Sequence, residues 1–72
     1  MGNDVRHQVG SRIRSLREAA GISLRQFALS IGADKTYLSE VELGRRSPTL
    51  DTLERIAHGL GLTLEELFEG IE

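Results

Sequence analysis

The sequence predicts an all-α fold, a compact five-helix bundle in which the second and third helices form a helix-turn-helix. Three observations support this prediction. Along five stretches, apolar residues recur at intervals of three and four positions, the spacing that places them on one face of a helix. Glycines and one proline separate these stretches, and no stretch has the alternating pattern of a strand. The chain of 72 residues has no cysteine, so a single apolar core must hold the fold without disulfides.

The first helix is expected over residues 9–20, and residues 1–8 are expected to form a flexible N-terminal arm. Gly21 follows this helix and can adopt the left-handed conformation that ends it. Its apolar face, which we expect to be buried, consists of Val9, Ile13, Leu16 and Ala20. The helices together would form one domain over residues 9–70, followed by a C-terminal end of residues 71–72.

The second and third helices are short and close together in the sequence. Ser23 and Gln26 form a capping box, and the apolar residues that follow it stop at Gly32. Asp34 can accept hydrogen bonds from the first amides of the next helix, which is expected to end at Gly44. A helix-turn-helix is therefore predicted from Ser23 to Gly44.

A steep crossing of two such helices requires particular residues. The crossing point needs a small side chain and the turn needs a residue that tolerates positive φ, and Ala28 and Gly32 meet these two needs. Ile31, Leu38 and Val41 have the spacing to fill the corner from both helices. The turn and the interior of the corner thus favour the same motif.

The fourth helix follows a basic linker, residues 45–48, whose proline prevents the third helix from continuing. Thr49 is the expected cap of the fourth helix, and Gly59 or Gly61 marks its end. Its buried face is expected to contain Leu50, Leu53, Ile56, Ala57 and Leu60.

The fifth helix opens with a second capping box, from Thr63 to Glu66. It carries more apolar residues than a terminal turn needs, and these are candidates for contact between two copies of the chain: Leu64, Leu67, Phe68 and Ile71. The alternative is that Leu67 and Phe68 only close the core over the first and fourth helices.

Charge divides the chain into two unlike halves. Residues 1–46 contain eight basic and five acidic residues (+3), whereas residues 47–72 contain one basic and six acidic residues (−5), which together give the net charge of −2. Such asymmetry suggests that one face meets a polyanion while the other stays solvated or pairs with protein.

The composition also argues against several classes of protein. No metal site is expected, because the chain has no cysteine and its two histidines, His7 and His58, are far apart. We find neither a membrane span nor a signal peptide, so we expect a cytoplasmic protein without a membrane partner. We expect no cofactor and no small-molecule ligand. An enzyme is not expected either, because Glu40 and Glu42 point to different faces of one helix and no serine is paired with a nearby base.

Four segments of the chain match a known family: IRSLREAAGIS at 13–23, FALSIG at 27–32, TYLSEVELG at 36–44 and SPTLDTL at 47–53. From Val9 to Gly70 the chain resembles the phage-repressor and Cro-like (XRE-like) helix-turn-helix domains. The segment DKTYLS at 34–39 is similar to the controller proteins of restriction-modification systems, and stand-alone repressors share it. The resemblance implies a lambda-repressor-like fold and a transcriptional regulator, in particular a repressor, that binds double-stranded DNA as a homodimer on a palindromic operator.

The resemblance further implies that the third helix enters the major groove and reads base edges. The base-reading residues carried over in this way are Lys35, Thr36, Ser39 and Glu40. Lys35 can donate to guanine, Thr36 can touch a thymine methyl group, and Glu40 can accept from cytosine N4. Glu40 could instead exclude wrong bases or pair with a neighbouring arginine.

Contacts to the DNA backbone are expected from the start of the second helix, from the third helix and from the loop after it: Ser23, Arg25, Tyr37, Arg45 and Arg46. Leu24 departs from the family, which commonly has glutamine there, so one contact is missing unless Arg25 or a backbone amide replaces it. Tyr37 could instead lean on the second helix. The resemblance also implies a structural ion pair between Arg17 and Glu42 behind the recognition helix.

A second interpretation is a protein-interaction module of the same fold, such as an antitoxin or an adaptor whose DNA binding is secondary. The acidic C-terminal half and Leu24 support it. The two interpretations differ in what they predict for DNA affinity, which falls steeply with salt only if phosphates are bound.

Overall fold

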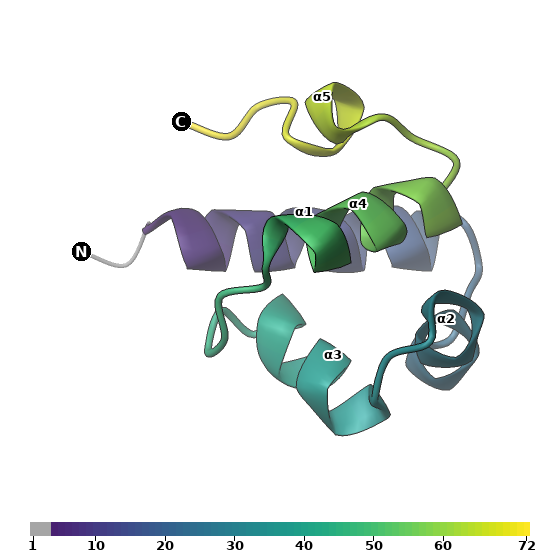
Figure 1. Ribbon diagram of the computed structural model, residues 1–72. Coiled ribbons are helices and arrows are strands. Elements are labelled where there is room, and N and C mark those ends of the chain that lie inside the picture. Colours follow the sequence, from purple (N-terminus) through teal and green to yellow (C-terminus); the bar gives the residue numbers. More distant parts are fainter. Residues whose placement is uncertain (1–3) are drawn as a thin grey trace.

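Five helices make up the described part of the chain, residues 4–72 of the computed structural model (Figure 1). They are α1 (Val5–Ala19), α2 (Leu24–Ile31), α3 (Lys35–Glu42), α4 (Leu50–Gly59) and α5 (Leu64–Leu67). No strand occurs between residues 4 and 72, so the predicted all-α, five-helix fold is confirmed. None of these helices combines the length and the apolar character that crossing a membrane would require.

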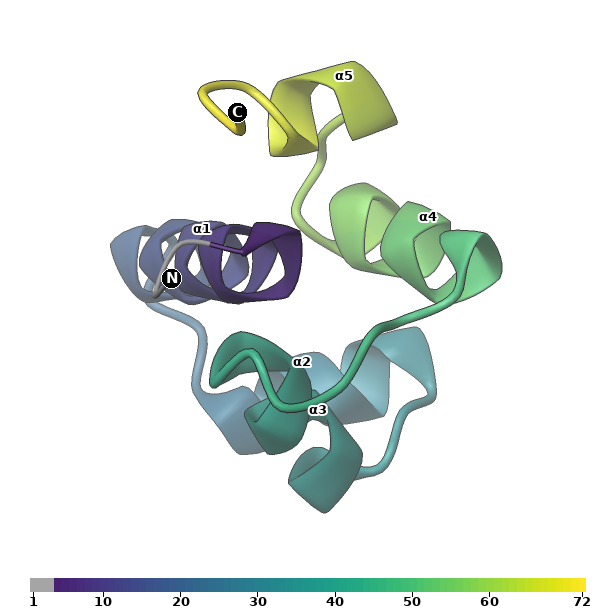
Figure 2. The same ribbon diagram turned by 90° about the vertical axis from the view of Figure 1, so that its left-hand side faces the viewer.

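The helices are arranged in three layers. α1 and α4 lie beside each other in the middle layer, with α2 and α3 on one side and α5 with the C-terminal residues on the other (Figures 1 and 2). The middle layer therefore separates α5 from the pair formed by α2 and α3.

Each helix begins at a polar side chain that accepts a hydrogen bond from the backbone N–H three residues later. These caps are Asp4, Ser23, Asp34, Thr49 and Thr63. Both predicted capping boxes are present, since the side chains three residues after Ser23 and Thr63 bond back to the backbone of the cap. Such caps satisfy amides that have no partner within the helix, and they fix where four of the predicted helices begin.

The start of α1 differs from the prediction. The helix begins at Val5 because Asp4 accepts a hydrogen bond from the His7 backbone N–H at 2.9 Å. The predicted arm over residues 1–8 is therefore wrong for residues 5–8, which form the first turn, and residues 1–3 lie outside the described residues. α1 ends at Ala19, close to the expected end.

The core draws on every helix, and its buried apolar residues are Val9, Ile13, Phe27, Ala28, Ile31, Leu38, Val41, Leu53, Ile56, Ala57 and Leu67. Two residues expected on buried faces are exposed, Ala20 and Leu50. Ala20 is the C-cap residue of α1 and lies beyond the packed turns. Leu50 lies about 90° around α4 from the centre of its buried face, because Thr52 occupies the buried position of the first turn.

The C-terminal segment is fastened to α1 by hydrogen bonds. Arg12 donates to the carbonyl oxygens of Glu66 and Leu67 at 2.9 and 3.2 Å, at the C-terminal end of α5. Gln8 exchanges two hydrogen bonds with the backbone of Glu72, at 3.2 and 3.0 Å. Leu67 is fully buried in the core, so of the two alternatives for this residue, closing the core is the one seen here, and it is not exposed to a second copy.

α1 and α3 approach each other closely at Gly10. A Cβ atom added there would lie 2.6 Å from the carbonyl oxygen of Glu42 and would also overlap that of Val41. Both obstructing atoms belong to the backbone, so they cannot move without moving α3. Gly10 is thus required by the packing of these two helices.

Gly10→Ala is expected to destabilise the fold, although alanine is the better helix former by about 1 kcal/mol. Overpacking of a tight contact costs about 1–3 kcal/mol, and here it would separate α1 from α3. Thermal unfolding followed by circular dichroism measures the effect, with the exposed neighbour Ser11→Ala as a control that should change stability by less than about 0.5 kcal/mol. A Gly10→Ala variant that unfolds at the same or a higher temperature would show that the close approach is not required.

Candidate nucleic-acid interface

The corner between α2 and α3 is built by the residues that the sequence pattern selected. Gly32 has a φ of 69°, in the left-handed region, and the Ala33 N–H donates to the Ala28 carbonyl at 2.9 Å. Inside the corner, Leu38 and Val41 are fully buried or nearly so. This tight connection leaves one side of α3 without a covering element.

The uncovered side of α3 carries the four predicted base-reading residues. Lys35 and Thr36 are exposed in the first turn, and Ser39 and Glu40 are half-buried one turn later. Residues three and four positions apart share a face of a helix. Ser39 lies four positions after Lys35 and Glu40 four positions after Thr36, so these side chains form one continuous polar strip. The strip ends at the N-terminal turn, where Asp34 caps the helix by accepting from the Tyr37 backbone N–H.

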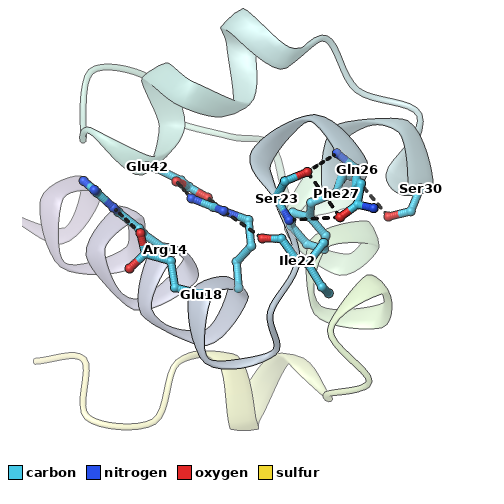
Figure 3. Close-up of polar contacts among 9 residues, drawn as sticks. Arg14, Glu18, Ile22, Ser23, Gln26, Phe27, Ser30 and Glu42 are labelled. Carbon is cyan, nitrogen blue, oxygen red and sulfur yellow. Dashed lines mark hydrogen bonds and ion pairs between the residues drawn. The ribbon is translucent and has the colours of Figure 1, made fainter.

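The N-terminus of α2 presents backbone amides beside this strip. Ser23 is committed to the capping box, since its N–H donates to the Gln26 side-chain oxygen and its hydroxyl accepts from the Gln26 N–H (Figure 3). The amides that remain for an anion are those of Leu24 and Arg25, at the positive end of the helix dipole. The predicted phosphate contact by Ser23 would therefore have to compete with its capping bonds.

The predicted contact residues gather on the side of the molecule formed by α2, α3 and the loop that follows. Arg25 and Lys35 line one shallow hollow between α2 and α3. Ser39 lines a second hollow together with Leu24, Arg14 and Leu43. The sequence interpretation did not place Arg14 and Leu43 next to these contact residues. The spacing could have indicated Arg14, because it lies three residues before Arg17 and therefore on the same face of α1.

Glu40, Arg46 and Tyr37 form a group at the C-terminal half of the strip. Arg46 Nε donates to Glu40 Oε1 at 2.9 Å, and the guanidinium carbon lies 5.5 Å from the centre of the Tyr37 ring. Of the two alternatives for Glu40, pairing with a neighbouring arginine is the one seen in this structure. Arg45 is exposed, and the described residues give it no side-chain partner.

Behind the strip, Arg17 and Glu42 form the expected ion pair. Arg17 Nε and Nη2 donate to the two carboxylate oxygens of Glu42 at 2.7 and 3.0 Å, and Nη1 donates to the carbonyl of Ile22 at 2.9 Å (Figure 3). Both residues are buried. The hydrogen bond to Glu42 raises the pKa of Arg17 despite the opposing effect of burial. The pair joins α3 to α1. Arg17 also joins both helices to the loop before α2 through the Ile22 carbonyl, and the sequence did not indicate this third hydrogen bond.

Comparison with known proteins assigns the family. The sequence pattern of the helix-turn-helix family HTH_3 matches residues 13–67, which is most of the chain. The protein belongs to the HTH_3 helix-turn-helix family. The resemblance to XRE-like domains is thereby confirmed.

Two relatives are similar to this chain over nearly their whole length. The control protein C.MunI from Mycoplasma sp. is 44% identical over 71 residues, covering 97% of this chain and 96% of C.MunI. The restriction-modification controller protein C.AhdI from Aeromonas hydrophila superposes with a TM-score of 0.83 at 35% identity, covering 86% of this chain and 94% of that one.

Another similar structure contains DNA. SinR, a master regulator for biofilm formation solved in complex with DNA, has a TM-score of 0.78 at 31% identity, with 83% of this chain and 97% of that chain covered.

Other curated relatives are longer than this chain. The chain spans less than half the length of three HTH-type transcriptional regulators that it matches.

Glu42→Ala is expected to lower the free energy of unfolding by about 3–5 kcal/mol, because it leaves the buried guanidinium of Arg17 without its counter-ion. Chemical and thermal unfolding measure the loss. Glu18→Ala provides a matched control, since Glu18 pairs with Arg14 at 3.1 Å on the surface of α1 (Figure 3) and an exposed pair contributes less than about 1 kcal/mol. Equal unfolding midpoints for the two variants would contradict the proposed role of the buried pair.

Proposed function

We propose that this protein is a sequence-specific double-stranded DNA-binding transcriptional regulator, and a repressor, whose α3 enters the major groove. The observation that carries the proposal is the exposed polar strip of α3, which a buried ion pair holds in a fixed orientation. Membership of the HTH_3 family and the DNA complex of SinR support it. The family is a regulatory DNA-binding one rather than an enzymatic one.

The polar strip of α3 would contact bases, and the groups around it would contact phosphates. Lys35 and Thr36 stand at the N-terminal turn of α3, the part that reaches base edges when such a helix lies in the major groove. The amides of Leu24 and Arg25 and the side chain of Arg45 are placed around the strip, where they would meet phosphates on either side of the groove. Phosphate contacts would position the protein, and α3 would supply its sequence preference.

The same proposal includes a homodimer, because one helix-turn-helix covers too little DNA to be both tight and selective. An apolar groove offers the contact surface, and its lining residues are Val5, Arg6, Val9, Ser47, Pro48, Leu53, Phe68 and Ile71. Leu64, Phe68 and Ile71 of the predicted dimer set are all half-buried and packed against the core, but only Phe68 and Ile71 line this groove. Val5 is 57% exposed and adds α1 to this surface.

Selection from a random duplex pool is expected to enrich a palindrome whose half-sites are spaced by about one helical turn, 34 Å. Affinity for this palindrome should fall steeply with salt, because each neutralised phosphate contributes about −0.9 to the slope of the logarithm of the binding constant against the logarithm of the salt concentration.

Lys35→Ala should weaken binding to the enriched site by about 1–3 kcal/mol and relax the preference at one base pair of each half-site. Arg55→Ala on α4 removes the same charge outside the strip and should leave that preference intact. No enrichment at low salt would favour a protein-interaction module instead.

Sedimentation in the absence of DNA is expected to show a dimer at concentrations of about tens of micromolar. Val5→Glu should shift the protein toward monomer, since it places a charge in the apolar groove while an acidic residue in the first turn still suits the helix dipole. Leu29→Glu changes an exposed leucine of α2 outside the groove, 75% accessible, and should leave the dimer intact. A monomeric wild-type protein, or equal effects of the two variants, would contradict this placement of the interface.

A further inference from the structure

Arg46 lies in the loop after α3 and reaches back to the recognition helix. Its Nε donates to Glu40 Oε1 at 2.9 Å, and its guanidinium lies over the ring of Tyr37 at 5.5 Å. The side chains of Arg46 and Glu40 are 57% and 36% exposed, so the pair is at the surface of the strip rather than in the core. Two neighbours therefore restrain one flexible cation at the place where α3 would meet DNA.

The carboxylate of Glu40 presents an electrostatic problem for DNA binding. A negative charge that enters the major groove is repelled by the phosphates on both sides, unless a cation neutralises it. Arg46 supplies that cation within hydrogen-bonding distance. The pair carries no net charge, so Glu40 can approach the bases without the repulsion that an isolated carboxylate would meet.

The pairing also leaves one acceptor available. Arg46 donates to Glu40 Oε1, and Glu40 Oε2 has no hydrogen-bond partner among residues 4–72. A carboxylate oxygen can only accept a hydrogen bond, and in the major groove the amino group at cytosine N4 is the donor that acidic side chains take. Stacking on Tyr37 limits the positions that the guanidinium can occupy, and hence the direction of the free oxygen.

We propose that Arg46 is a positioning residue for Glu40: held between Tyr37 and Glu40, it neutralises and orients the carboxylate so that the free oxygen accepts from cytosine N4. This inference rests on the proposed DNA-binding function. It assigns to Arg46 a share of the preference at a base pair that Arg46 itself does not touch. An arginine that only bound phosphate would strengthen binding to every sequence alike.

The test begins with the wild-type protein and its selected duplex. Selection repeated with Glu40→Ala identifies the base pair at which Glu40 acts, as the one position in each half-site where the preference is lost. Fluorescence anisotropy then gives the affinity for the selected duplex and for the duplex with that base pair changed. The ratio of the two affinities is the discrimination at that position.

Arg46→Ala is expected to reduce this discrimination at least about threefold, while Glu40→Ala/Arg46→Ala discriminates no worse than Glu40→Ala alone. Arg45→Ala is the matched control in the same loop, because the described residues give Arg45 no side-chain partner. It should weaken binding to both duplexes by one factor and leave the ratio unchanged. Arg46→Lys, which keeps the charge but not the planar fork, should retain part of the discrimination.

Three results would overturn the inference. Arg46→Ala could weaken binding to both duplexes equally and make the affinity less dependent on salt, as expected for Arg45→Ala. Arg46 would then be a phosphate contact only. Glu40→Ala could leave every position of the selected site unchanged, and Glu40 would then read no base. If the wild-type protein selects no sequence, the proposed function fails and this inference with it. Unfolding midpoints of all variants separate these results from a loss of folded protein.

Discussion

The buried ion pair between Arg17 and Glu42 fixes the position of α3, and the outer surface of the molecule follows from it. Such a pair adds little net free energy compared with an apolar replacement, because desolvation of the charges offsets their attraction. Its contribution is geometric. Two parallel hydrogen bonds define both the distance and the rotation of one helix against the other, and the third bond, to the Ile22 carbonyl, adds the loop before α2. The polar strip faces outward because Leu38 and Val41 are buried on the opposite side of α3, and the ion pair between the two sides keeps the helix from rotating.

α1 is the element to which both sides of the molecule are attached. Toward α3 it offers Gly10, where the two backbones touch, and Arg17. Toward α5 it offers Arg12, which binds the last carbonyls of that helix, and Gln8, which binds the backbone of Glu72. The positions of the candidate DNA surface and of the apolar groove therefore both depend on α1. A displacement of α1 would move the two surfaces together.

The sequence predicted local features well and long-range ones poorly. Caps such as Ser23 and Asp34 act on amides a few residues away, so residue type and spacing were enough to locate them. The start of α1 was missed because Val5 is the single apolar residue of its first turn, and the position of the start depends on the cap by Asp4. The exposure of Leu50 depends on which neighbours cover α4. The pairing of Glu40 with Arg46 depends on the path of the loop after α3, which spacing does not specify.

The layered arrangement also gives the molecule a direction. The acidic residues of α5 lie beyond the middle layer, on the far side from α2 and α3 (Figure 1), while Arg25, Lys35, Arg45 and Arg46 lie on or next to the helix-turn-helix. A net charge of −2 would by itself keep the protein away from a polyanion. The separation of charge along one axis instead produces an electric dipole, and the field near DNA exerts a torque that turns the helix-turn-helix toward the phosphates before contact. An acidic protein can thus approach DNA in the right orientation.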